Sequence, residues 1–380
     1  MSTTLVSMRY FENIGEPAEW SVDTLSLRPV NLIVGKNATG KSRTMNVIWN
    51  LALALLQKKR LLVAGFDLVF RSGESELKYN LQVKGGIVLH EEVIVDGRLM
   101  LKRTEDEAKI HAFALGDFMN IKPPANELAA VVKRDDLQHD FLSPLHEWAS
   151  GVRHYSFGDR MGRGHAAVLV EGGGEADDSD EDLVAGIFRR GQKEYGEAFT
   201  ASLVRDMQRL GYGVTEVLLH PFGEILEPIN RPLHGLSVKE IGIGDVVIQN
   251  AMSQGMFRAL SILVHVTFAQ MGQRAHCILI DDIGEGLDFE RSSILIDMLR
   301  EKSRESGFQL VMTTNDRFVM NHVPLDEWSV LQRNGCHVVV KNNENSQQQF
   351  EEFKLVGLSN FAFFEMDFVN GGPEEDNDIE

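Results

Sequence analysis

The residues of this sequence that could do chemistry gather in three short stretches. The first runs from Asn31 to Ser42, with the letters NLIVGKNATGKS. An apolar strand leads into the pattern G-x-x-x-x-G-K-[ST], in which Gly35 and Gly40 stand where side chains would obstruct backbone N–H groups directed at phosphate. Lys41 supplies a charge that we expect to face solvent and the phosphates, and the Ser42 hydroxyl can ligate Mg²⁺. The stretch predicts a nucleotide-binding loop followed by a helix whose dipole favours phosphate. A glycine-rich turn that binds nothing is the alternative.

The second stretch, Cys277–Asp288, is an apolar strand that ends in two carboxylates. Asp281 can hold Mg²⁺ through its water shell, and Asp282 can orient or deprotonate an attacking water molecule. The alternative is a strand that is merely capped by solvated aspartates. A phosphate-binding loop in the same chain favours phosphoryl transfer.

The third stretch, Ala251–Leu263, begins a helix with Ser253, Gln254 and Gly255. A serine and a glycine N–H at a helix N-terminus form a second device that can bind phosphate. By itself, Ser253 is better explained as an ordinary helix N-cap. Its position shortly before Asp281 favours the phosphate-binding interpretation.

Strands and helices around these stretches must hold them in place. We expect an antiparallel meander over Phe66–Leu101, with tight turns at Gly85-Gly86 and Asp96-Gly97, and a mainly helical region over Ala125–Gly211. Further strands are expected at Leu5–Phe11, Ser21–Leu27, Val214–His220, Leu233–Val238, His276–Ile280, Phe308–Met312, Trp328–Gln332 and His337–Lys341. Helices are expected at Lys41–Gln57, at Val184–Leu210 as one long helix, and at Ser292–Ser303.

Together the three stretches resemble the ATP-binding-cassette (ABC) ATPases, particularly the non-transporter branch that includes RecF, SMC-type heads and the OLD-like antiphage-defence ATPases. The motif order matches: Walker A at Gly35–Ser42, signature at Met252–Gly255, Walker B at Ile278–Asp281, then the D-loop with Asp288. The resemblance covers about Leu5–Gln57 and Ile248–Arg333. It implies an α/β fold: a P-loop ABC-ATPase head with a mixed sheet, an antiparallel β subdomain and a helical insertion or lid.

The resemblance also implies cofactors, partners and roles. ATP and Mg²⁺ would bind between two copies of the chain, with Ser253, Gln254 and Gly255 of one copy reaching the nucleotide held by the other. Mg²⁺ would be held by Ser42 and Asp281, and hydrolysis would involve Asp282, Asn315 and Lys41. The nucleotide-binding residues would be Gly35, Lys36, Asn37, Ala38, Thr39, Gly40, Lys41, Ser42 and Arg43.

Two departures from the family pattern bear on turnover. Asp282 stands where the family usually has glutamate, and Asn315 stands where it usually has the switch histidine. Asn315 can donate a hydrogen bond to a γ-phosphate but cannot exchange a proton at neutral pH. Both departures predict slow hydrolysis; Glu285 is a candidate to compensate for Asp282, and Gln138 is one candidate for the family's Q-loop glutamine.

Composition bounds the function further. The formal net charge of −18 disfavours a broad nucleic-acid-coating surface, although a local basic patch could bind nucleic acid. Two cysteines exclude a disulfide scaffold, and the histidines lack metal-ligand spacing. No apolar run approaches membrane-spanning length, so we expect a cytoplasmic protein. A basic stretch could contact phosphate or be a solvated loop; it contains Arg153, His154, Arg160, Arg163 and His165. Leu355–Phe368 is either core or a strip that docks a partner.

From these observations we expect four segments: an N-terminal ATPase lobe (1–122), a helical insertion with an acidic loop (123–245), a C-terminal ATPase lobe (246–345) and a C-terminal segment with an acidic tail (346–380). The chain is expected to be an ATPase that dimerises on ATP and controls a protein effector in antiphage defence or genome maintenance. A RecF-like DNA-repair ATPase that binds DNA directly, or a nucleotide-gated scaffold with negligible hydrolysis, are the alternatives.

Overall fold

The computed structural model describes residues 3–158, 161–165, 167–168, 176–226 and 231–370. The chain divides into two compact units, the first formed by Met1–Val152 with Val323–Glu380 and the second by Arg153–His322. The acidic tail and Arg160 fall outside the described residues, as does part of the acidic loop before the helices of the second unit.

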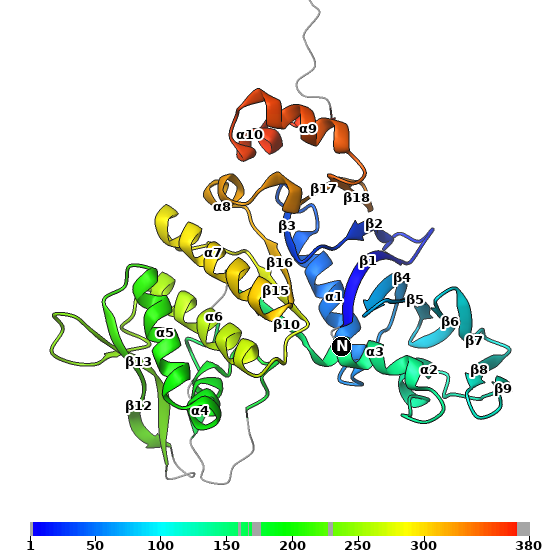
Figure 1. Ribbon diagram of the computed structural model, residues 1–380, viewed down its shortest axis with the longest axis horizontal. Helices are drawn as coiled ribbons and strands as arrows, with labels where there is room; N and C mark the ends of the chain where they lie inside the picture. The colour runs from blue at the N-terminus through cyan, green and yellow to red at the C-terminus, as the bar shows by residue number, and fades with distance from the viewer. Residues whose placement is uncertain (1–2, 159–160, 166, 169–175, 227–230, 371–380) are drawn as a thin grey trace, which may run out of the picture. The chain divides into compact units, whose positions relative to one another are not determined.

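The first unit contains a mixed sheet in which strands from both ends of the chain are neighbours. Its strands follow the order β3-β17-β18-β2-β1-β4-β5-β6-β7-β8-β9. The β3–β17 and β18–β2 pairs are parallel, and the meander from β4 onward is antiparallel (Figure 1). The bounds are β1 Thr3–Glu12, β2 Trp20–Ser26, β3 Val30–Val34, β4 Ala64–Ser72, β5 Ser75–Lys84, β6 Ile87–Val95, β7 Arg98–Arg103, β8 Ala108–Ala112, β9 Asp117–Asn120, β17 Trp328–Asn334 and β18 His337–Asn342.

The described residues of this unit form five helices: α1 Lys41–Leu55, α2 Ala129–Val132, α3 Ser143–Ser150, α9 Gln347–Val356 and α10 Asn360–Glu365. Three short 3₁₀ turns are η1 Asp140–Leu142, η2 Leu325–Glu327 and η3 Phe368–Asn370. The two C-terminal helices are joined by aromatic packing, because the Phe363 ring lies 4.6 Å from that of Phe350 and 5.0 Å from that of Phe353. Part of the segment Leu355–Phe368 is therefore core, which is one of the two possibilities that the sequence left open.

The second unit places two parallel strands among helices. β15 (Cys277–Asp281) pairs with β16 (Gln309–Thr313), and β10 (Val152–Ser156) is the other neighbour of β15. A small antiparallel sheet consists of β11 (Ala167–Val168), β12 (Val214–Leu226), β13 (Arg231–Glu240) and β14 (Val247–Ile248). The helices are α4 Val184–Tyr195, α5 Glu197–Arg209, α6 Gln254–Met271, α7 Phe289–Ser306 and α8 Arg317–His322. α4 and α5 pack on α6 (Figure 1).

Two sequence-based expectations about this region are wrong. Strand β10 lies inside the stretch expected to be helical. Its Arg153 is only 4% exposed and pairs with Asp178 at 2.9 Å. This buried charge interrupts the apolar pattern from which a strand could have been predicted. The single long helix is instead α4 and α5, separated at Gly196, whose φ of 60° and ψ of −139° are incompatible with a helix. No helix among the described residues is long and apolar enough to cross a membrane.

Candidate functional site

The loop from Gly35 to Gly40 connects the fully buried strand β3 to the first residue of α1, as the sequence predicts. Its two glycines are required by close contacts. A Cβ atom on Gly35 would lie 2.6 Å from Thr39 Oγ1 and 2.8 Å from the Leu331 carbonyl oxygen, and Gly40 has a φ of 106°. The Thr39 hydroxyl donates to the Lys36 carbonyl at 2.9 Å, which closes the loop on itself. The loop expected to bind phosphate is thus held in shape by its own glycines and hydroxyl.

Lys41 occupies the centre of this loop. Contrary to the expectation that it faces solvent, its residue is only 6% exposed. Its Nζ donates to the Gly35 carbonyl at 2.8 Å and to the Lys36 carbonyl at 3.4 Å. A buried ammonium requires acceptors, and the loop carbonyls supply them. Ser42 and Arg43, the next residues of α1, are exposed.

A cluster that the sequence reasoning missed lies beside the start of α1. The Arg43 guanidinium lies 4.0 Å from the centre of the Trp20 ring and forms an ion pair with Glu12. Tyr10 donates to the same Glu12, and burial raises the pKa of Tyr10, so this phenol remains a donor. Trp20 in turn lies against Gly40: a Cβ atom on Gly40 would lie 3.2 Å from the Trp20 ring. Trp20, the aromatic residue at the start of β2, was the only signal in the sequence for this cluster.

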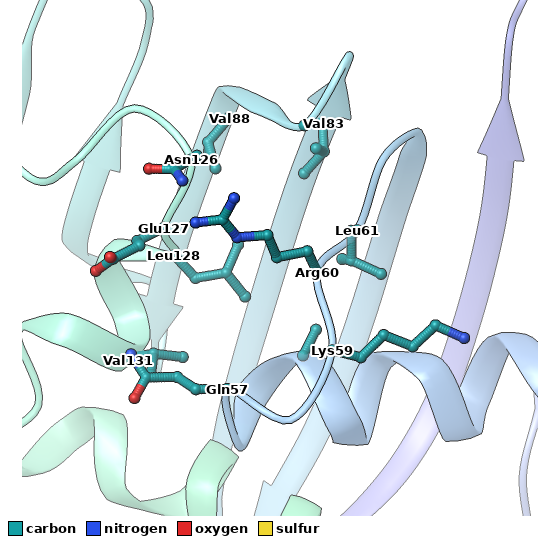
Figure 2. Close-up of a pocket in the computed structure, with 12 residues that line it drawn as sticks. Gln57, Lys59, Arg60, Leu61, Val83, Val88, Asn126, Glu127, Leu128 and Val131 are labelled. Atoms are coloured by element: carbon teal, nitrogen blue, oxygen red, sulfur yellow. The ribbon is translucent and has the colours of Figure 1, made fainter.

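Two pockets adjoin these elements of the first unit. One, of about 540 Å³, is lined by the loop residues 36–39, the β17–β18 turn and the C-terminal residues Phe364, Asp367 and Asn370. The other lies at the opposite end of α1, where Figure 2 shows the Arg60 side chain extending toward Asn126 and Lys59 pointing away. The first pocket adjoins the loop, although its lining includes neither Lys41 nor Ser42.

In the second unit, Asp281 ends strand β15 and Asp282 follows it directly, and hydrogen bonds from the neighbouring strand hold both residues. The Thr313 hydroxyl donates to Asp281 Oδ1 and accepts from the Asp282 N–H at 2.9 Å. The Ile283 N–H donates to the Thr313 carbonyl at 2.9 Å. Thr313 was not anticipated, although a polar residue ending an apolar strand was available as a signal. Asp282 adopts a φ of 53°, a conformation that aspartate tolerates better than most residues.

Asn315 follows β16 and is exposed. Its neighbours are ordered by local hydrogen bonds: the Asp316 N–H donates to Thr314 Oγ1 at 3.0 Å, and Asp316 accepts from the Phe318 N–H at 2.6 Å. The pairing of β15 with β16 therefore places Asn315 at the same edge as Asp281 and Asp282, because carboxyl ends of parallel strands meet there.

The expected signature begins helix α6. Ser253 is the N-cap and accepts from the Met256 N–H at 3.2 Å, so the ordinary capping role exists whether or not phosphate binds. A Cβ atom on Gly255 would lie 2.5 Å from the Gly286 carbonyl oxygen, so only glycine allows the D-loop to approach the signature helix. Arg258, one turn further on, donates to the Glu285 carbonyl at 2.9 Å and to the Gly158 carbonyl.

Asp288, in the expected D-loop, caps helix α7 by accepting from the Arg291 N–H at 2.9 Å, and this hydrogen bond lowers the pKa of its carboxyl group. Glu285 and Asp282 both approach Gly158. A Cβ atom there would lie 2.6 Å from Glu285 Oε2 and 3.2 Å from Asp282 Cβ. The structure thus places Glu285 close to Asp282, the residue for which it is a candidate to compensate.

Gln138, the Q-loop candidate, has its side-chain oxygen engaged by the Ala114 N–H at 2.9 Å, in the β8–β9 connection. Among the described residues, no group of three or more His, Cys, Asp or Glu side chains could hold a metal ion by itself. Any Mg²⁺ would depend on hydroxyl, single carboxylate and phosphate oxygens, which is typical of nucleotide-bound Mg²⁺.

Comparison with solved structures identifies the architecture. The chain superposes on an Smc head bound to the C-winged helix domain of ScpA with a TM-score of 0.54 and 17% identity, over 91% of this chain and 99% of that one. This is the fold of an SMC head. The SMC head domain from Thermotoga maritima matches with a TM-score of 0.46 and 14% identity, over 89% of this chain and 98% of that one. No protein-family model and no curated protein matches the sequence. The expected α/β architecture, with a large mixed sheet and a smaller antiparallel sheet, is confirmed.

Proposed function

We propose that this protein is an ABC-type ATPase that binds and hydrolyses ATP as a nucleotide-dependent dimer. The observation that carries the proposal is Lys41, whose ammonium is drawn into a glycine-shaped loop between buried β3 and the N-terminus of α1. From this position the Lys41 ammonium can exchange its carbonyl acceptors for β- and γ-phosphate oxygens. The SMC-head fold supports the same proposal, because the loop lies on an architecture shared with ATPase heads.

Each unit, taken by itself, offers oxygen donors of the kind that suits Mg²⁺-ATP. Ser42 offers an exposed hydroxyl at the start of α1, and Asp281 offers a partly exposed carboxylate that Thr313 orients. When bound, Mg²⁺ would neutralise phosphate charge. Asp282 would orient water, and Asn315 would donate to the γ-phosphate. Ser253 and Gly255 of a second copy, with Asp288 in the D-loop, would complete the site.

We further propose that the ATPase cycle controls a protein partner. The last helices leave an apolar strip exposed, although Phe363 in the same segment is buried. Leu355 is 88% exposed, Val356 51%, Leu358 48% and Met366 40%. Exposed apolar side chains concentrated in one segment suit a docking surface. The similar Smc head was itself crystallised with ScpA. A role in antiphage defence or genome maintenance rests on the sequence resemblance alone.

One alternative keeps specific support. Asp282 is one methylene shorter than the family's glutamate, and exposed Asn315 cannot take up a proton. Both features favour slow turnover, and at the limit a nucleotide-gated scaffold in which ATP binding, not hydrolysis, is the signal. A RecF-like DNA-binding role has less support, since the formal net charge is −18.

The proposal is tested by Lys41→Ala. Loss of a charge-assisted contact to phosphate should weaken ATP binding by roughly ten- to a hundredfold and abolish hydrolysis. Isothermal calorimetry measures the first effect and phosphate release the second. Because Lys41 is buried, Lys41→Met, which keeps the alkyl volume, serves where the alanine variant is unstable.

Lys122→Ala, an exposed lysine outside the loop, is the matched control and should bind ATP as the wild type does. Unchanged ATP affinity in a folded Lys41 variant would refute the loop assignment. Binding without measurable hydrolysis in the wild type would favour the scaffold alternative.

A further inference from the structure

Arg163 is fastened to the residues that lead into the expected signature. One of its guanidinium nitrogens, Nη2, donates to the Met252 carbonyl and lies 3.3 Å from the Asn250 carbonyl oxygen. This one nitrogen carries two N–H groups, so it can donate to both carbonyl oxygens. Met252 immediately precedes Ser253 and Asn250 lies three residues before it, so a residue 89 positions from Met252 in the sequence holds the entry to helix α6.

The main chain around Arg163 is held just as firmly, by Gln249. This glutamine is 2% exposed, and its amide nitrogen donates to the Arg163 carbonyl at 3.0 Å and the His165 carbonyl at 2.9 Å. Its amide oxygen accepts from the Leu236 N–H of β13 at 2.9 Å. Side chain and main chain of Arg163 are therefore both tied to the stretch 249–252. We call this set of contacts the Arg163 clasp.

The clasp acts on the direction of a peptide group. In a planar trans peptide, the carbonyl of one residue and the N–H of the next point in opposite directions. Fixing the Met252 carbonyl on Arg163 therefore fixes the Ser253 N–H away from it. Ser253 itself remains exposed at the N-terminus of α6. Arg163 thus determines how the first polar groups of this helix are presented.

A pocket of about 350 Å³ opens beside the clasp, lined by Arg163, Gly164, Asn250, Gln254, Phe257 and Arg258. Its lining holds two guanidinium groups and no carboxylate. Arg258 is anchored independently, on the Gly158 and Glu285 carbonyls. The helix is therefore held by Arg258, whereas the loop before it depends on Arg163, and a change at Arg163 should disturb the loop selectively.

We propose that Arg163 is a positioning residue for the signature: it orients the Met252–Ser253 peptide so that Ser253 can engage a nucleotide held by a second copy of the chain. This inference rests on the proposed function. Arg163 need not touch the nucleotide. Its effect should appear in steps that require the signature, namely ATP-dependent dimerisation and hydrolysis, and be absent from steps that require the Gly35–Ser42 loop alone.

The test separates those steps in Arg163→Ala. ADP affinity, by calorimetry, reports the loop and should stay within about twofold of wild type. The rate of hydrolysis at saturating ATP, and dimerisation with a non-hydrolysable ATP analogue measured by light scattering, should each fall by roughly ten- to a hundredfold, the loss expected for charge-assisted hydrogen bonds. Arg163→Lys keeps the charge but loses the planar guanidinium geometry that brings Nη2 to both carbonyls, and it should fall between alanine and wild type. Arg205→Ala, an exposed arginine of α5, is the matched control and should behave as wild type.

Ser253→Arg distinguishes failure of the inference from failure of the proposed function. If Ser253→Arg is inactive while Arg163→Ala and Arg163→Lys hydrolyse ATP at the wild-type rate, the positioning role is refuted and the proposed function stands. If Ser253→Arg remains active, the signature role fails and the inference fails with it. A merely structural Arg163 would lower the melting temperature and ADP affinity together with hydrolysis, and that pattern in both variants would also overturn the proposal.

Discussion

At the scale of single residues, the nucleotide loop contains one residue in an unfavourable conformation. Ala38 has a φ of 64°, in the left-handed region where a Cβ atom crowds the backbone. Its carbonyl accepts from Arg333 Nη1 at 3.2 Å, so the β17–β18 turn helps to hold it there. Strain of this kind persists where surrounding contacts over-determine the backbone, and it gathers at ligand-binding loops.

Replacing Ala38 by glycine should relieve this strain. We expect Ala38→Gly to raise the free energy of unfolding by up to about 1 kcal/mol, because the gain in the folded state exceeds the added entropy of the unfolded chain. Urea unfolding of the two proteins measures the difference.

Ala52→Gly, in the interior of α1, is the control and should destabilise by about 1 kcal/mol or more, since glycine is unfavourable in a helix and this site is buried. An Ala38→Gly variant that loses as much stability as Ala52→Gly would show that the conformation of Ala38 is not strained.

At the scale of elements, α6 is buried from Gly255 to Ala269, and it carries an ionisable residue inside this buried stretch. His265 lies 4.8 Å from the Tyr155 ring, and its Nε2 lies 3.2 Å from the Glu181 carbonyl oxygen. The pKa of His265 is lowered to about 4, chiefly by burial and to a smaller extent by Arg153, whereas the Glu181 carbonyl, Asp178 and Asp180 oppose the shift. The helix that bears the signature is therefore built around a neutral histidine.

This pKa predicts how stability depends on pH. Because the unfolded state takes up a proton near pH 6.5 and the folded state only near 4, the contribution of His265 is complete above pH 6.5 and declines as the pH falls between these values. By pH 5.5 the loss should reach about 1.4 kcal/mol, one pKa unit below the unfolded value.

His265→Gln, close to histidine in volume and not ionisable, removes this dependence. Urea unfolding at pH 7.5 and 5.5 should show a smaller fall in stability for the variant than for the wild type. Equal falls in both proteins would mean that His265 is protonated in the folded state.

At the scale of the whole molecule, the proposed assembly consists of two copies related by a two-fold axis. Such an isologous arrangement closes as a dimer and places two composite sites at the interface. ATP would join the copies, and loss of the γ-phosphate would release them, which supplies a switch. A formal net charge of −18 on each copy should oppose closure, so moderate salt should strengthen the ATP-bound dimer.

Mixing two inactive variants tests this assembly. Lys41→Ala removes the loop side of each site, and Ser253→Arg removes the signature side. A mixed dimer carries both lesions in one site and none in the other, so equal mixing should restore about a quarter of wild-type activity if half of the dimers are mixed and the sites are independent.

Each variant alone should stay inactive, and mixing should be verified with differently tagged copies. Absence of recovery despite demonstrated mixing would contradict independent composite sites. Activity of Ser253→Arg alone would remove the signature from the mechanism.

The sequence by itself determined the parts of the fold that depend on contiguous residues. β3, the loop after it and α1 were predictable because apolar periodicity, paired glycines and the following lysine lie within one short stretch. The same holds for the hairpin at Asn334-Gly335 and for the parallel strands around Cys277 and Leu310. In each case local backbone preference and burial point to the same element.

Only the tertiary structure decided which distant groups meet. It buries the Lys41 ammonium against the loop carbonyls and brings the Thr313 hydroxyl to Asp281. In strand β10 it supplies Asp178 as the partner with which Arg153 is buried. It also joins Arg163 to Asn250 and Met252 across 87 and 89 residues of sequence. A polar side chain far from its partner reads as a solvated residue, because the acceptor that makes its burial favourable is supplied only when the chain has folded.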